Sequence, residues 1–135
     1  MNIESLIFTT SQGVPEPVAP FSHVTTANGW AYLTGQLPID PTTGEVQRGS
    51  VVEQTHQVMA NLCAVLEGCG YSLDDVVMAR AFLADMADYE LFNTSYNRWF
   101  EGRRLPSRTC VAVSGLALGA LVEIDLTAFK GDQTS

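Results

Sequence analysis

The chain has 135 residues, of which 46% are hydrophobic and 16% are charged, a composition typical of one folded domain with a real core. The net charge of −8 argues against a nucleic-acid partner, because the phosphate backbone would repel it. No apolar run reaches the roughly 18 residues of a membrane span, and the N-terminal residues lack the pattern of a signal peptide. We therefore expect a cytoplasmic protein without a membrane partner.

The first third of the chain is predicted to form a β-hairpin after a proline-rich entry. Residues 6–9 form a short possible strand, and the prolines that follow forbid a helix as far as residue 20. Residues 21–26 and 30–34 are rich in strand-forming side chains. Asn28-Gly29 between them favours a tight hairpin turn.

The first helix is predicted over residues 50–70. Ser50 is a suitable N-cap, and Glu53 three residues later completes a capping box. Apolar residues recur at three- and four-residue spacing, which gives one buried stripe. Gly70 is a fitting end for this helix.

The sequence then predicts a buried strand over residues 76–83 and a second helix over residues 89–100. Arg80 is the only charged residue of the strand, and Asp88 is the expected cap of the helix.

Residues 106–129 are predicted to form two strands joined by a glycine-rich connection, as a hairpin. Arg108 opens the first strand, two residues before Cys110. In the second strand Glu123 and Asp125 alternate with apolar residues, so the two sets lie on opposite faces. A cation and a carboxylate in one hairpin predict a site for a small anionic molecule.

These elements predict a single α+β domain, 1–135, with two helices on one face of a mixed sheet. The other face of the sheet is then bare, and a bare apolar face favours oligomerisation. The two histidines and three cysteines form no recognisable metal site, and no nucleotide-binding motif is present. The only lysine, Lys130, lies near the C-terminus, which disfavours Schiff-base chemistry. We expect neither a metal nor a cofactor.

Several segments, in this order and spacing, resemble the Rid (YjgF) family of imine/enamine deaminases. The matching segments are Pro20-Phe21-Ser22, Thr34-Gly35-Gln36, the DPTTGEV loop, residues 93–96, Arg108-Thr109-Cys110-Val111 and the GALVEI run that contains Glu123. The resemblance implies a chorismate-mutase-like fold and a trimer whose sheets form an inner barrel, with ligand sites between subunits. It also implies hydrolysis of 2-imino acids, or their enamine tautomers, to 2-oxo acids and ammonium, without a cofactor.

The resemblance assigns roles to five residues of this chain. Arg108 matches the residue that holds the substrate carboxylate, and Glu123 matches the carboxylate that positions water. Cys110 matches a residue whose backbone meets the substrate, while Thr34 and Asn93 match accessory pocket residues. An arginine suits its role because its planar fork meets a carboxylate with two hydrogen bonds.

Two positions expected to border the cleft depart from the family pattern. Phe21 stands where many members have tyrosine, and His23 stands where many have glutamine. We expect Phe21 to line the cleft and His23 to replace a polar contact or to shuttle a proton. These departures leave the substrate open, and a specialised enamine of the 2-aminomuconate or aminoacrylate type is a second candidate.

The same residues would also suit a protein without catalytic activity. A trimer could bind 2-oxo acids or a protein partner without turning over a substrate. As a separate alternative, Arg108 and Glu123 could each form a structural ion pair with a neighbouring subunit. Asp125 shares the face of Glu123, and the sequence does not decide whether it takes part. Cys110 has no histidine fixed beside it, so a backbone contact is preferred to a nucleophilic thiolate.

Overall fold

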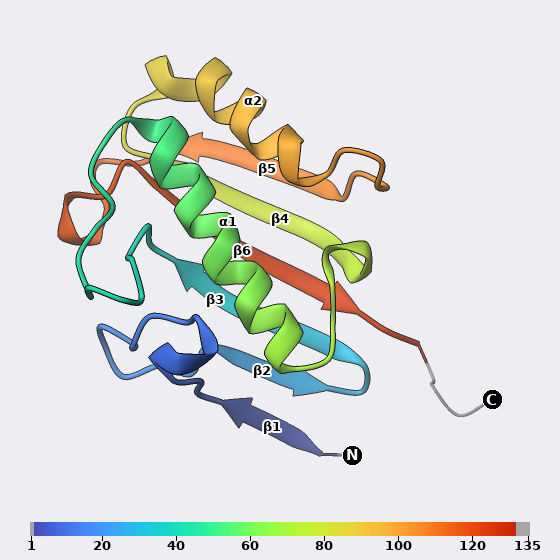
Figure 1. Ribbon diagram of the computed structural model, residues 1–135. Helices are drawn as coiled ribbons and strands as arrows, with labels where there is room; N and C mark the ends of the chain where they lie inside the picture. Colours follow the sequence, from blue (N-terminus) through green and yellow to red (C-terminus); the bar gives the residue numbers. More distant parts are fainter. Residues whose placement is uncertain (1, 132–135) are drawn as a thin grey trace.

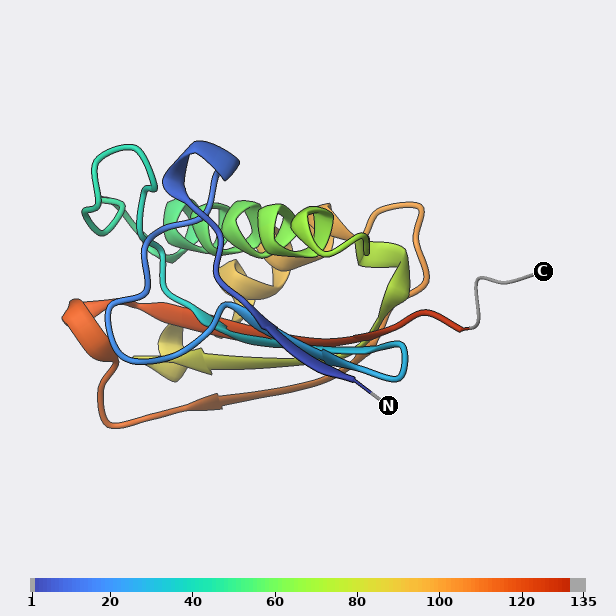
Figure 2. The same ribbon diagram turned by 90° about the horizontal axis from the view of Figure 1, so that it is seen from below.

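The computed structural model describes residues 2–131, which form a six-stranded sheet with two helices on one face (Figures 1 and 2). The strand order is β1-β2-β3-β6-β4-β5, with β4 and β5 parallel and the other neighbours antiparallel. The predicted α+β architecture is confirmed. The strands and helices are β1 (Ile3–Leu6), β2 (Val24–Ala27), β3 (Trp30–Gln36), α1 (Val51–Gly68), β4 (Val76–Leu83), α2 (Tyr89–Trp99), β5 (Ser107–Ala112) and β6 (Val122–Phe129).

The hairpin of β2 and β3 turns at the predicted pair. Asn28 and Gly29 have φ angles of 52° and 86°, the left-handed values that a two-residue hairpin turn requires. The strand that precedes this hairpin differs from the predicted segment of residues 6–9: β1 spans Ile3–Leu6 and shares only Leu6 with it. The backbone N–H of Phe8 donates to the ring of His23 at 2.9 Å, and so it is not available to a strand ladder.

The long helix α1 begins at the predicted capping box. The backbone N–H of Ser50 donates to Glu53 Oε2 at 3.0 Å, and Ser50 Oγ accepts from the backbone N–H of Val52 at 3.2 Å. The predicted apolar stripe faces the sheet and forms the centre of the core, together with the inner faces of the strands. Its fully buried hydrophobic side chains are Val51, Val58, Met59, Leu62, Val65 and Leu66.

The second helix, α2, crosses over β5 and begins without the predicted cap. Asp88 occupies the N-cap position, but its side chain accepts no capping hydrogen bond. Asp85 instead accepts from the backbone N–H of Ala87 at 2.9 Å, in the short 3-10 turn that precedes α2. The buried face of α2 carries Phe92 and Tyr96.

The predicted hairpin over residues 106–129 is wrong, because β4 lies between β5 and β6. The β5 strand pairs in parallel with β4, whose other edge pairs with β6 (Figure 1). Parallel strands need a long crossover connection, and α2 provides it between β4 and β5. The short 3-10 helix Ala117–Gly119 belongs to the connection that then passes from β5 to β6.

The face of the sheet opposite the helices is uncovered in the single chain (Figure 2). Large hydrophobic side chains on this face remain exposed: Tyr32 by 51%, Val111 by 43%, Phe129 by 38% and Trp30 by 37%. The bare apolar face that the pattern predicts is therefore present. Within residues 2–131, no helix combines the length and the apolar character needed to cross a membrane.

Candidate functional site

The guanidinium of Arg108 packs against three aromatic rings of α2. Arg108 pairs with Ala79 of β4, a buried residue of the helix-covered face, so its side chain points to the same face. Its guanidinium carbon is 5.8, 5.4 and 5.1 Å from the ring centres of Tyr89, Phe92 and Tyr96. These three positions recur at i, i+3 and i+7, so they share one face of the helix.

The positive charge of Arg108 is not neutralised by a carboxylate within residues 2–131. The two ion pairs of this region join Arg80 to Asp125 and Arg103 to Asp74. Among the described residues, the one side-chain hydrogen bond of Arg108 runs from Nη2 to the hydroxyl of Tyr89 at 3.2 Å. A half-buried guanidinium with free donors is suited to an anionic ligand.

Two residues that line the pocket beside Arg108 carry a buried polar atom with no partner within residues 2–131. The pocket has a volume of about 260 Å³ and is lined by Asn93, Tyr96, Asn97, Leu105, Pro106 and Arg108. The two buried atoms are Asn93 Oδ1 and the hydroxyl oxygen of Tyr96, and neither forms a hydrogen bond in the described part of the chain. Burial raises the pKa of Tyr96 to about 12, so its hydroxyl keeps the proton. The pocket thus brings the predicted Arg108 and Asn93 together, with Tyr96 beside them.

Cys110 lies on the same face of β5 as Arg108, and its thiol is half-buried. Burial raises the pKa of this thiol, which disfavours a thiolate nucleophile. Its backbone, by contrast, faces outward. The N–H of Val113 bonds to the carbonyl of Leu83 on β4 at 2.9 Å. The backbone N–H and C=O groups of successive residues point to alternate edges of a strand. Those of Val113 point to β4, so those of Arg108 and Cys110, which lie an odd number of residues away, point to the free edge of β5. The predicted backbone role of Cys110 fits this geometry.

Glu123 occupies the uncovered face of the sheet. It pairs with Phe82 of β4, next to Arg80 and on the side away from the helices. Its side chain lies over Gly35 of β3, where an added Cβ would overlap the carboxylate. Burial, and secondly the charge of Asp125, raises the pKa of Glu123. A side chain at position 35 would therefore force the Glu123 carboxylate to move from this position.

Asp125 shares the face of Glu123 but is already paired. Its two oxygens accept from Arg80 Nε at 3.0 Å and Nη2 at 2.8 Å, a bidentate ion pair between β4 and β6. This pairing also accounts for the charged residue within the otherwise apolar β4. Asp125 is thus a structural partner of Arg80 in the single chain.

The two predicted catalytic residues lie on opposite faces of one sheet. Arg108 faces the helices at the edge strand β5, whereas Glu123 faces away from them on β6, with β4 in between. Within a single chain these two residues therefore do not meet in one site, and we call their surroundings the Arg108 and Glu123 half-sites.

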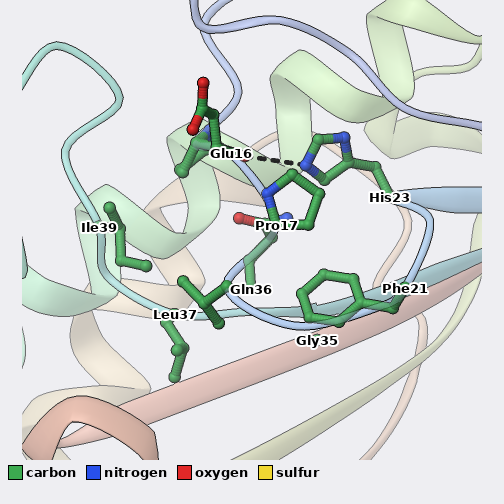
Figure 3. Close-up of a pocket in the computed structure, with 10 residues that line it drawn as sticks. Glu16, Pro17, Phe21, His23, Gly35, Gln36, Leu37 and Ile39 are labelled. Carbon is green, nitrogen blue, oxygen red and sulfur yellow. Dashed lines mark hydrogen bonds between the residues drawn. The ribbon is translucent and has the colours of Figure 1, made fainter. Parts of the chain in front are cut away.

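The second half-site includes Thr34 and Phe21. Thr34 follows Tyr32 on the uncovered side of β3, and its hydroxyl donates to the carbonyl of Ser22 at 2.6 Å. Phe21 and Gly35 line a small pocket with a volume of about 20 Å³ (Figure 3). That volume holds about one water molecule, so this pocket alone cannot enclose a substrate.

His23 is buried and connects three segments of the backbone. Its Nδ1 accepts from the N–H of Phe8 at 2.9 Å, and Nε2 then carries the proton and donates to the carbonyl of Pro15 at 2.8 Å (Figure 3). Both ring nitrogens are occupied, so a ligand could reach either only by breaking one of these bonds. A glutamine side chain also offers one acceptor and one donor type. His23 therefore has a structural role in joining these backbone segments.

We expect His23→Gln to remove an acid-sensitive contribution to stability. Burial lowers the pKa of His23 from 6.5, so between the folded and unfolded pKa values the unfolded chain binds more protons. The wild-type free energy of unfolding should fall as the pH drops below about 6.5. Urea denaturation between pH 7.5 and 5 would check this. The control is His56→Gln, because His56 accepts from Trp99 Nε1 at 2.9 Å elsewhere. If the pH dependence of the free energy of unfolding disappeared in His56→Gln but persisted in His23→Gln, the assignment to His23 would be contradicted.

Tyr96, which lines the pocket, and Tyr89, whose hydroxyl contacts Arg108, were not predicted as site residues. The i, i+3, i+7 spacing of Tyr89, Phe92 and Tyr96 was visible in the sequence. Its relation to Arg108 was not, because it depends on α2 crossing over β5.

Comparison with known proteins gives consistent matches along nearly the whole chain. The model of the family described as Endoribonuclease L-PSP matches residues 11–130. A RutC family protein of Pyrococcus horikoshii is 40% identical over 128 residues, which cover 95% of this chain and 99% of the relative.

Solved structures share the fold. A protein of the conserved Rid family from Yersinia pestis, YyfA, has a TM-score of 0.90 at 34% identity, covering 96% of this chain and 100% of that one. E. coli TdcF with bound serine has a TM-score of 0.88 at 26% identity, covering 95% and 100%. The chain belongs to the Rid (YjgF) family, whose family model is described as Endoribonuclease L-PSP.

Proposed function

We propose that this protein is a hydrolytic deaminase that converts 2-imino acids, or their enamine tautomers, to 2-oxo acids and ammonium. Arg108 holds the substrate carboxylate, and Glu123 positions and deprotonates the attacking water. Asn93, Thr34, Phe21 and the backbone of Cys110 complete the binding site, while His23 supports its wall.

The observation that carries this proposal is the unpaired charge of Arg108 in a pocket with unpaired polar groups. An unsatisfied buried polar group costs about 1–3 kcal/mol. A ligand with a carboxylate for Arg108 and an N–H for Asn93 Oδ1 would satisfy two such groups together. The relative TdcF was solved with serine bound, a small molecule that carries both groups.

We further propose that the functional protein is a homotrimer in which each site is completed by a neighbouring chain. The exposed residues Trp30, Tyr32, Val111 and Phe129 give the uncovered sheet face an apolar surface to bury. The neighbouring chain would bring its Glu123 half-site to the Arg108 pocket. In this arrangement Arg108 and Glu123 meet across an interface between two chains, although they lie on opposite faces of the sheet within one chain.

Hydrolysis of an imine needs a proton acceptor and a proton donor. The water oxygen bonds to the C=N carbon while Glu123 takes one water proton and passes it to the imine nitrogen, which gives a carbinolamine. Glu123 then takes the proton of the carbinolamine hydroxyl and passes it to the same nitrogen. The C–N bond breaks, ammonia leaves and the C=O of the 2-oxo acid forms. No electron is transferred, so the reaction needs no redox cofactor. The raised pKa of Glu123 brings this carboxylate closer to the range in which a group both accepts and returns protons.

Imines generated in situ from amino acids provide the direct test. Wild type is expected to accelerate their loss above the buffer rate, and Glu123→Gln is expected to lower kcat by about 10²–10⁴-fold. The wild-type kcat/KM should also fall at acid pH as Glu123 is protonated, and this limb should be absent in Glu123→Gln. Retained activity in Glu123→Gln would remove this residue from the mechanism.

The substrate panel should include enamines of the aminoacrylate and 2-aminomuconate types. The apolar ring of Phe21, in place of the frequent tyrosine, favours a substrate with an apolar portion beside the Glu123 half-site. If every imine decays at the buffer rate while a 2-oxo acid still binds, the non-catalytic binding function replaces the deaminase. The net charge of −8 disfavours RNA as the substrate that the family description suggests.

A further inference from the structure

Arg108 is held by groups that orient it without neutralising it. An arginine in a binding site is commonly fixed by a carboxylate, which also removes part of its charge. Here the contacts are three aromatic rings and one phenol hydroxyl, all from α2. The faces of aromatic rings attract a cation but carry no net charge. The guanidinium therefore keeps its full charge for a ligand.

The hydroxyl of Tyr89 is the only directional contact among these. A ring face under a guanidinium restricts its tilt but leaves rotation within its plane free. The bond from Nη2 to the Tyr89 hydroxyl, 3.2 Å long, fixes that rotation. One edge of the guanidinium is thereby occupied, and the remaining donors are left for the pocket with Asn93 and Tyr96.

We propose that Tyr89 is a positioning residue that fixes the guanidinium of Arg108 in the orientation that binds the substrate carboxylate. This rests on the proposed carboxylate-binding role of Arg108. Tyr89 touches no reacting atom and acts through Arg108 alone. Since a bidentate pair depends on the direction of both N–H groups, loss of the Tyr89 hydroxyl weakens carboxylate binding while the charge remains.

The variant Tyr89→Phe tests this because it keeps the ring and removes only the hydroxyl. Calorimetry with 2-oxobutanoate is expected to show a Kd about three- to tenfold higher than wild type. In the imine assay KM should rise by a similar factor with kcat nearly unchanged. Tyr71→Phe is the matched control, because the Tyr71 hydroxyl donates to the Gly29 carbonyl at 2.8 Å in another part of the molecule. It should leave both Kd and KM within twofold of wild type.

A second measurement does not depend on activity. In ¹⁵N-labelled protein, rotation of the Arg108 Nη groups should be slow in wild type and faster in Tyr89→Phe, as seen by NMR line shapes. Equal rotation rates, or an unchanged Kd in Tyr89→Phe, would overturn the proposal. If wild type turns over imines while both measurements are unchanged, the deaminase stands and the positioning role falls. If imines are untouched while Kd and rotation both change, the positioning role stands and the deaminase falls.

Discussion

Replacing Arg108 with alanine is expected to reduce imine turnover to the buffer rate without dissociating or unfolding the protein. Each hydrogen bond to a charged group contributes about 1.5–3 kcal/mol, so the loss of a two-bond carboxylate contact lowers kcat/KM by about 10²–10⁴-fold. Folding should survive because Arg108 forms no ion pair within residues 2–131 and lies only half-buried at the edge strand β5. Initial rates with in situ imines, together with size-exclusion chromatography, would measure both properties.

Two companion variants make this result specific. Arg108→Lys keeps the charge but not the planar fork, so it should recover only a small part of the lost kcat/KM. Arg98→Ala removes an exposed arginine of α2 and should behave as wild type. Full turnover by Arg108→Ala would exclude the deaminase proposal, since the carboxylate would then be held elsewhere.

Mixing two inactive variants is expected to restore activity if each site is shared between chains. In a hybrid of Arg108→Ala and Glu123→Gln subunits, some interfaces join an intact Arg108 from one chain to an intact Glu123 from its neighbour. Random mixing at equal amounts gives such a pairing at about one quarter of the interfaces of a ring. Co-expression with two different tags, purification of the mixed oligomer and an imine assay would measure the recovery.

A mixture of Arg108→Ala with the double variant Arg108→Ala/Glu123→Gln serves as its control, because no interface then contains an intact Arg108. This control should remain inactive. If the first mixture also stays inactive while its subunits are shown to have exchanged, the two residues must act within one chain. That result would contradict the shared site, and the opposite faces of Arg108 and Glu123 would need another explanation.

Local signals in the sequence predicted most of the elements. The strand over residues 76–83 and the capping box at Ser50 appear in the structure where the pattern placed them. The turn at Asn28-Gly29 does so as well. Each depends on a short stretch: a run of buried residues, a reciprocal pair of hydrogen bonds, or a backbone conformation available to asparagine and glycine.

The pairing of the last two strands was not predictable in the same way. The sequence places Arg108 and Glu123 in neighbouring segments, which suggested a hairpin. The structure inserts β4 between them, because the βαβ crossover through α2 brings β5 beside β4 in parallel. This strand order depends on contacts between segments far apart in the chain, so no local sequence pattern predicts it.

By itself the sequence determined the α+β class, the bare sheet face and the residue types of the candidate site. These follow from side-chain periodicity, helix caps and turn chemistry, which act over a few residues. Only the tertiary structure decided that Arg108 and Glu123 occupy opposite faces of the sheet and that Tyr89 holds Arg108. It likewise placed His23 between the backbones of Phe8 and Pro15 rather than open to a ligand. These outcomes depend on strand order and on the crossing of α2 over β5, which are set by long-range packing.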